Sequence, residues 1–68
     1  MSKIDFCNLL FRYIGDGFTI LDIETETFIY TYDFEEDNLL LSKSHFTLSS
    51  SGMLSFKIEY EDVKDIRC

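Results

Sequence analysis

Apolar and polar residues follow a helical period near the start of the chain. The segment 2–17, SKIDFCNLLFRYIGDG, has its apolar residues spread over a wide arc. Three polar residues share the remaining stripe: Asp5, Asn8 and Arg12. Ser2 can cap the first turn, and glycines at the end of the segment suit the close of a helix. The wide apolar arc predicts a helix that lies deep against a sheet.

The rest of the chain alternates as β-strands do. Strands are predicted over 18–24, 27–34, 39–44, 45–48 and 53–60. Gly52, in the loop before the last of these, can take a positive φ. The tail 61–68 predicts a short turn and an edge strand that directs Val63 and Ile66 inward. The fold class is therefore α+β, as one domain over residues 1–68. An N-terminal helix packs on a small antiparallel sheet of four to five strands, as a meander or an SH3-like open barrel.

Pairing these strands predicts a core. We expect the first hairpin to close with Ile23 opposite Phe28, and the second with Phe34 opposite Leu39. One sheet face then collects apolar residues: Leu21, Ile23, Phe28, Tyr30, Tyr32, Phe34, Leu39 and Leu41. The alternating aromatic residues of 28–34 are interpreted as interior packing, and the alternative is an exposed ligand site.

The opposite face of the same strands mixes aliphatic and acidic side chains. The expected register places these residues there: Phe18, Ile20, Asp22, Glu24, Ile29, Thr31, Asp33 and Leu40. Solvated faces rarely carry so many large aliphatic residues, whereas protein interfaces combine an apolar centre with a polar rim. The face is therefore a candidate interface. The alternative is that the helix or the C-terminal strands cover it.

Composition adds a strong charge asymmetry. The chain of 68 residues has a net charge of −7. Two acids balance two bases in residues 1–17, and four balance four in residues 43–68. All the net charge therefore lies in residues 18–42, which contain no lysine or arginine. Such a segment serves solubility or steers the protein toward a basic partner. It does not bind nucleic acid directly, because phosphate contacts need Lys or Arg.

Catalytic, cofactor and metal motifs are not recognisable in the chain. The run DFEEDN resembles the start of a calcium loop, but Asn38 stands where glycine is needed and Ser44 where a bidentate glutamate is needed. We expect no enzyme activity, no cofactor and no metal. Apolar runs are too short to span a membrane, and no signal peptide is recognisable. We therefore expect a cytoplasmic protein without a membrane partner.

Two functions follow from this pattern. The first is a non-enzymatic acidic interaction protein that binds and inhibits or regulates a basic, nucleic-acid-handling protein. Residues with AT-rich codons dominate the chain, which suits a virus or mobile element whose target is a host nuclease or defence complex. The second is a structural module that self-associates as a homodimer through the apolar sheet face, with the acids serving solubility only. The residues predicted to bind the partner are Ile20, Asp22, Glu24, Glu26, Ile29, Asp33, Glu35, Glu36, Asp37 and Leu40.

Overall fold

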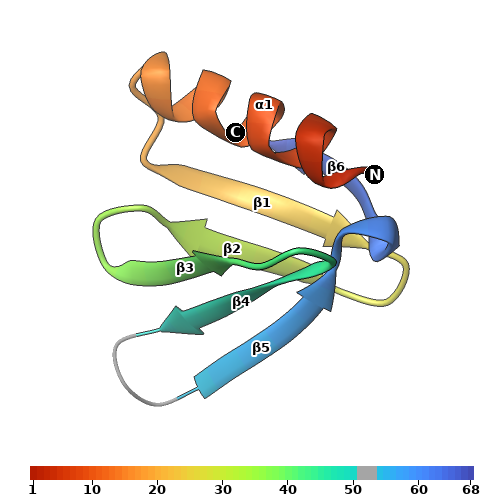
Figure 1. The fold of residues 1–68 in the computed structure, drawn as a ribbon. Coiled ribbons are helices and arrows are strands. Elements are labelled where there is room, and N and C mark those ends of the chain that lie inside the picture. The colour runs from red at the N-terminus through yellow and green to blue at the C-terminus, as the bar shows by residue number, and fades with distance from the viewer. Residues whose placement is uncertain (51–53) are drawn as a thin grey trace.

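The computed structural model describes residues 1–50 and 54–68 (Figure 1). Its single α-helix among these residues is α1 (Lys3–Gly15). The strands are β1 (Ile20–Thr25), β2 (Ile29–Asp33), β3 (Asp37–Leu41), β4 (His45–Ser50), β5 (Leu54–Glu59) and β6 (Val63–Arg67). A short 3-10 helix, η1 (Tyr60–Asp62), joins β5 to β6. Within the described ranges, no helix has the length and apolar character needed to cross a membrane.

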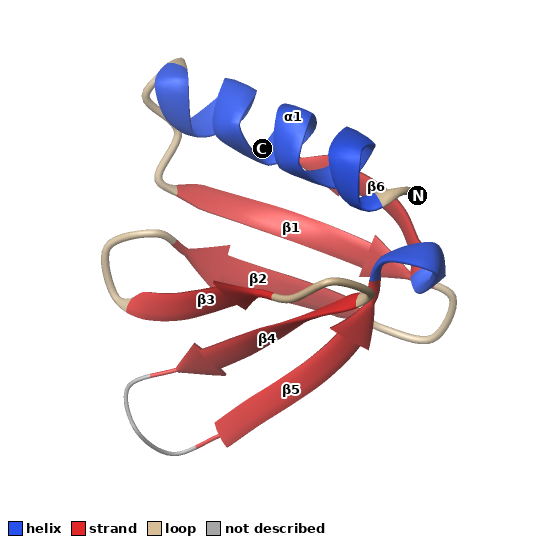
Figure 2. Ribbon diagram, viewed as in Figure 1, coloured by secondary structure: helices blue, strands red, loops and turns tan. Residues whose placement is uncertain are grey.

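The strands form two antiparallel sheets, each of three strands, and the helix lies over one of them (Figure 2). The order is β2-β1-β6 in the first sheet and β3-β4-β5 in the second. An α+β fold with antiparallel pairing is thus confirmed. The strand count differs from the four to five expected, because the described residues hold six strands in two separate sheets. The tail 61–68 contributes the edge strand β6, which pairs with β1.

The helix begins and ends where the sequence predicts, and most of its apolar arc packs against the core. The Asp5 N–H donates to the Ser2 hydroxyl oxygen at 3.1 Å, which caps the first turn. Gly17, with a φ of 96°, lets the chain leave the helix. Phe6 and Leu10 are buried, whereas Ile4 and Phe11 are exposed. The expected wide contact is confirmed in large part, because Cys7, Leu9, Tyr13 and Ile14 also pack against the core.

The first hairpin keeps its predicted faces, but its register differs by two residues. Ile23 lies opposite Tyr30, not opposite Phe28. The turn closes between Thr25 and Phe28, where the Thr25 hydroxyl accepts from the Phe28 N–H at 3.0 Å and donates to its carbonyl at 2.9 Å. A shift of two residues preserves the alternation of side chains, so the inward-facing residues of β1 stay buried.

The second hairpin is predicted incorrectly. β2 and β3 belong to different sheets, and β3 pairs with β4, with Leu39 opposite Leu48. Phe34 therefore does not lie opposite Leu39. Phe28 and Phe34, both expected in the core, are 61% and 48% exposed. Each lies just beyond one end of β2, where neither the helix nor the facing sheet covers it.

The core lies between the two sheets and beneath the helix. Phe6 of α1 stacks on Phe46 of β4, with ring centroids 4.4 Å apart, and both rings contact Tyr60. Val63 and Ile66 point into this core, as predicted. The core residues are Phe6, Leu10, Leu21, Ile23, Tyr32, Phe46, Leu48, Ile58, Tyr60, Val63 and Ile66. Of the other expected core residues, Tyr30, Leu39 and Leu41 pack against its margin.

The loop before β5 is only partly described. The predicted positive φ of Gly52 falls outside the described residues. Met53, the first residue of the predicted strand 53–60, also falls outside them, and β5 begins at Leu54.

Candidate functional site

The structure separates the ten residues predicted to bind a partner. Five share the outer face of the β2-β1-β6 sheet: Ile20, Asp22, Glu24, Ile29 and Asp33. Glu26 lies in the turn between β1 and β2, and three others surround the turn between β2 and β3: Glu35, Glu36 and Asp37. Leu40 lies on β3, opposite Thr47, and so belongs to the other sheet. Leu40 therefore does not join the predicted surface.

The outer face of the β2-β1-β6 sheet is open to solvent. Ile20 and Ile29 are 54% and 64% exposed, so neither the helix nor the C-terminal strands cover this face. Between them, Asp22 accepts a hydrogen bond from the Thr31 hydroxyl at 3.0 Å. Ile20 sits opposite Asp33 at one end of the sheet, and Ile29 sits opposite Glu24 near the other. Each exposed aliphatic residue therefore has an acidic neighbour, at opposite ends of the hairpin.

At the Ile29 end, basic residues of β6 neutralise the acids. Arg67 Nη2 lies 3.2 Å from Glu24 Oε1, and Lys64 Nζ lies 3.6 Å from Glu26 Oε2. A hydrogen bond to Asp65, and then the negative charges of Glu24 and Asp65, raise the pKa of Arg67 above its usual range. These bases are far away in the sequence and adjacent in the fold. Glu24 and Glu26 are therefore weaker candidates for contact with a basic partner.

At the other end, four acids form a cluster that we call the acidic turn: Asp33, Glu35, Glu36 and Asp37. The Asp33 N–H donates to Asp37 Oδ2, and the Glu35 N–H donates to Asp33 Oδ1, both at 3.0 Å. Among residues 1–50 and 54–68, no Lys or Arg forms an ion pair with these carboxylates. Two of the acids hold the backbone of the turn, and Glu35 and Glu36 are exposed. In the acidic segment 18–42, these four carboxylates are thus the group that lies together without a basic partner among the described residues.

Besides burial, the negative charge of the acidic turn contributes to a raised pKa of the buried residue Tyr32. Tyr32, the buried residue of β2, has its pKa raised by burial and then by the negative charges of Asp37 and Asp33. Tyr60 also has a raised pKa, chiefly because of burial and then the nearby Cys7, partly offset by the hydrogen bond that its hydroxyl donates to the Ser42 carbonyl at 2.8 Å. In both cases the fold favours the neutral phenol.

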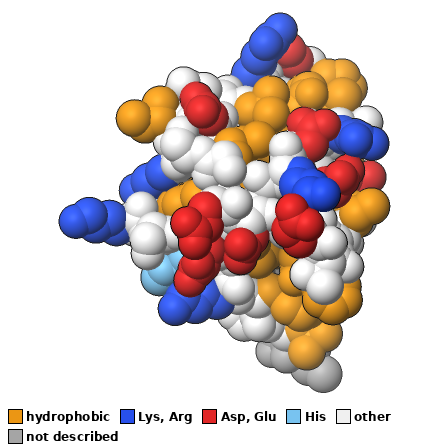
Figure 3. All heavy atoms as spheres, turned by 90° about the vertical axis from the view of Figure 1, so that its right-hand side faces the viewer, with side chains coloured by type: hydrophobic (Ala, Val, Ile, Leu, Met, Phe, Trp, Pro, Cys, Tyr) orange, Lys and Arg blue, Asp and Glu red, His pale blue; other side chains and the backbone are white. Residues whose placement is uncertain are grey.

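A second surface, which the sequence did not predict, lies between β2 and β5. Tyr30 is flanked by Phe28 and Phe56, at ring-centroid distances of 5.9 Å and 5.3 Å. We call these three rings the aromatic cleft. With Ile29 and Leu54 they make an exposed apolar area. Figure 3 shows hydrophobic side chains gathered in the lower right of that view, beneath a row of acidic side chains.

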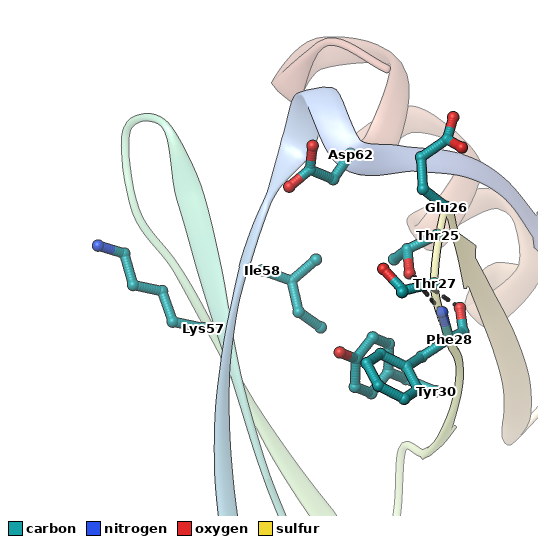
Figure 4. A pocket seen from close by; sticks show the side chains of 8 residues that line it. All are labelled: Thr25, Glu26, Thr27, Phe28, Tyr30, Lys57, Ile58 and Asp62. Carbon is teal, nitrogen blue, oxygen red and sulfur yellow. Dashed lines mark hydrogen bonds between the residues drawn. The ribbon is translucent and has the colours of Figure 1, made fainter.

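Two cavities open on either side of Tyr30. One, of 230 Å³, is shown in Figure 4, where Phe28, Tyr30 and Ile58 face one another while Lys57 points away. Glu26 and Asp62 also border it. The other, of 200 Å³, is lined by Ile29, Tyr30, Thr31, Asp37, Leu48, Ser50 and Phe56. It joins the aromatic cleft to Asp37 of the acidic turn.

Two of these aromatic residues, Phe28 and Tyr30, are predicted in the core for a sound reason. Alternation correctly assigns Tyr30 to the inward face of its strand. It does not reveal that the two sheets diverge beyond the helix and leave that face open. No spacing or composition signal in the chain marks that divergence.

Comparisons with known proteins found nothing similar to this chain. No family model matches the chain, and no match was found among curated proteins or solved structures. Within the described ranges, no group of three His, Cys, Asp or Glu side chains is placed to hold a metal ion.

Proposed function

We propose that this protein is a non-enzymatic, cytoplasmic interaction protein that binds a basic surface on another protein through its acidic turn. The observation that carries the proposal is the contrast between the two ends of the hairpin. Glu24 and Glu26 have basic partners, whereas the four carboxylates of the acidic turn have none among the described residues. Uncompensated like charges repel one another in the folded state, and an approaching cationic surface relieves that repulsion.

Apolar side chains beside the acidic turn supply the other part of an interface. Ile20 lies directly opposite Asp33, and Phe34 follows Asp33 in the turn. Both side chains are about half exposed. An apolar centre bordered by charged groups is the usual anatomy of a protein interface. In this proposal the acids steer the partner and set specificity, while the apolar residues contribute most of the affinity.

The class of partner follows from the charge. Proteins that handle nucleic acid carry Lys and Arg where phosphates bind, and a dense group of carboxylates competes for those positions. We therefore propose that the partner is a nucleic-acid-handling protein, such as a nuclease or defence complex, which this protein inhibits or regulates as a nucleic-acid mimic.

The fold suits presentation of such a surface. We interpret the two sheets as a small open barrel of the SH3-like type. In support, the last strand returns to pair with the first, and a 3-10 helix precedes it. In this arrangement the acidic turn is a connection between the sheets, so it projects without disturbing the core.

Self-association is the second candidate, favoured by the exposure of Ile20 and Ile29 on one sheet face. A homodimer through this face would bury both residues and leave the acids as solubilising groups. The acidic turn lies on the border of the same face, so two copies would bring like charges together. This repulsion makes the basic partner the stronger proposal.

The test is capture from host-cell lysate by the immobilised protein at low and high ionic strength. The variant reverses Glu35 and Glu36 to Lys, and leaves Asp33 and Asp37 unchanged because both bond the backbone of the turn. A matched control reverses Glu59 and Glu61, which are also exposed, with the same change in net charge.

We expect a nucleic-acid-handling protein to be captured by the wild type and by the control, but not by the variant. We also expect capture to weaken as salt rises and in the presence of competing DNA. Equal capture by variant and control shows that the acidic turn has no specific role, and capture that is insensitive to salt removes the electrostatic mechanism.

A further inference from the structure

The free edge of β2 has a defined set of hydrogen-bonding groups. In an antiparallel pair, backbone groups of alternate residues point toward the partner strand, and those of the residues between them point away. The Thr25 N–H donates to the Phe28 carbonyl at 2.8 Å, and the Phe34 N–H donates to the Thr19 carbonyl at 2.7 Å. These bonds fix the alternation along the whole hairpin. They place the N–H and C=O groups of Ile29 and Thr31 on the side away from β1.

No strand in the described ranges pairs with that side of β2. Sheet order puts β2 at the edge of β2-β1-β6, and β2 shares no ladder with β3, β4 or β5. At the acidic turn the edge groups of Asp33 are satisfied, because its N–H donates to Asp37 Oδ2 and its carbonyl accepts from the Glu36 N–H at 3.2 Å. Ile29 and Thr31 are therefore the two residues of β2 whose edge groups are open to pairing.

The open edge adjoins the aromatic cleft. The 200 Å³ cavity is lined on one side by Ile29, Tyr30 and Thr31, and on the other by residues of the facing sheet, including Phe56. A strand added to β2 would lie about 4.8 Å away, with side chains directed alternately to the two faces of the sheet. Its inward side chains would meet Tyr30 and Phe56, and its outward side chains would lie beside Ile29.

Charge decides what kind of strand fits. The cavity at the Thr31 end reaches Asp37 of the acidic turn. At the Phe28 end the charges are mixed, because Lys57 borders the cavity beside Asp62 and Lys64 pairs with Glu26. A second copy of this chain would bring acidic edges together, which opposes edge-to-edge pairing. A segment with a basic residue near Asp37 and a large apolar residue beside it matches the edge in charge and in shape.

We propose that β2 accepts an extended segment of the basic partner as an added strand, with one apolar side chain in the aromatic cleft. The inference rests on the proposed function, and it assigns the binding mode. Main-chain hydrogen bonds to Ile29 and Thr31 supply affinity, the cleft selects an apolar residue, and the acidic turn selects a neighbouring Lys or Arg. The partner is thus recognised through an extended or locally unfolded segment.

The test uses a short synthetic peptide in which Lys alternates with Val around a central Phe. Its matched control has the same sequence, with N-methyl groups on the amides that would face β2. The control keeps charge and side chains but loses those main-chain donors. We expect the methylated peptide to bind at least about tenfold more weakly, because two lost hydrogen bonds are involved. We also expect the peptide to slow hydrogen exchange at the Ile29 and Thr31 amides.

A variant of the protein tests the same edge from the other side. Thr31→Pro removes the N–H that faces the open edge, and proline is tolerated at edge positions of this kind. Thr31→Ala is its control, because both lose the hydroxyl that bonds Asp22. We expect Thr31→Pro to weaken binding of the peptide, and Thr31→Ala to leave it unchanged. If the proline variant does not fold, comparing the methylated and unmethylated peptides on the wild-type protein still tests strand addition.

Failure of this inference is distinct from failure of the proposed function. Equal binding of the two peptides, with loss of both in the Glu35→Lys, Glu36→Lys variant, overturns strand addition and leaves acidic recognition in place. Strand addition stands and acidic recognition fails if methylation weakens binding but the charge reversals do not. Protection of the Ile29 and Thr31 amides that rises with protein concentration, without peptide, identifies a second copy as the occupant and overturns the proposal. So does absence of peptide binding at low salt.

Discussion

The side-chain carboxylate of Asp37 accepts a hydrogen bond from the backbone N–H of Asp33, at 3.0 Å, where β2 turns toward β3. In a regular hairpin a backbone carbonyl would occupy this place. Here the Asp33 N–H is bonded to a side chain and not to the backbone of β3. β2 and β3 belong to different sheets, and the aromatic cleft lies between β2 and β5 of those sheets.

Asp37 is therefore expected to contribute to stability. Asp37→Ala leaves the partly buried Asp33 N–H without its acceptor, and we expect the free energy of unfolding to fall by about 1 kcal/mol. Asp37→Asn keeps an acceptor oxygen, so it should lower the free energy of unfolding by less than Asp37→Ala does. Urea denaturation measures both. Glu36→Ala is the control, with an expected change within about 0.5 kcal/mol because its side chain is exposed. Equal losses of unfolding free energy in Glu36→Ala and Asp37→Ala would show that the Asp37 carboxylate does not hold the turn.

The pairing of the second hairpin could not be predicted from the sequence, and the bond between Asp33 and Asp37 illustrates the reason. Alternation placed Leu21 and Ile23 in the core correctly, because side-chain direction depends only on position along a strand. Leu39 pairs with Leu48 and not with a residue of β2, and at the β2 end of the turn the Asp33 N–H is bonded by the side chain of Asp37. Acidic residues are common in turns of every kind, so their presence does not reveal this geometry.

In the candidate site, too, features set by neighbouring residues could be predicted, whereas contacts between distant segments could not. The charge excess of residues 18–42 is read directly from the sequence, and of the two alternatives left open for the face that carries Ile20 and Ile29, the structure supports the exposed one. The pairing of Glu24 with Arg67 was not, because it requires β6 to lie beside β1 after the chain has passed through the second sheet. Contacts between distant segments decide which acids remain free, and the sequence contains no local signal for them.

Two phenylalanines of the helix provide a matched test of the packing. Phe6 is fully buried and stacks on Phe46, whereas Phe11 is 56% exposed. Phe6→Ala is expected to cost about 3–5 kcal/mol, a large part of the about 3–10 kcal/mol typical of a chain this short. Phe11→Ala should cost well below half of that. Thermal and urea unfolding measure both changes. Similar losses at the two positions would mean that the outer face of α1 is also buried, for instance against another chain.

Stability is expected to fall at alkaline pH. The folded state raises the pKa of Tyr32 and Tyr60 above the ordinary value of about 10, so the folded protein holds these protons more tightly than the unfolded chain. Their contribution is therefore fully present below about pH 10 and is lost as the pH rises through the folded-state values. Urea midpoints across this range, with phenolate absorbance, test the prediction.

The variant Tyr32→Phe separates this effect from other alkaline titrations. It removes the ionisable group beside Asp33 and Asp37, so the decline in stability with pH should become shallower. Tyr60→Phe should also flatten the decline, but from a lower starting stability, because the Ser42 carbonyl loses a donor at 2.8 Å. An unchanged slope in both variants would assign the decline to other groups.

Salt should act in opposite directions on the two kinds of association that this surface permits. Binding of a basic partner to the acidic turn weakens as ions screen the attraction between opposite charges. Self-association through Ile20 and Ile29 strengthens, because the same ions screen repulsion between copies while the apolar contact is unaffected. Sedimentation at rising salt should therefore show a monomer that begins to pair only at high ionic strength. Ile29→Asp should stay monomeric throughout. A dimer that is already stable at low salt would show that the free acids do not oppose pairing, and would make the homodimer the primary assembly.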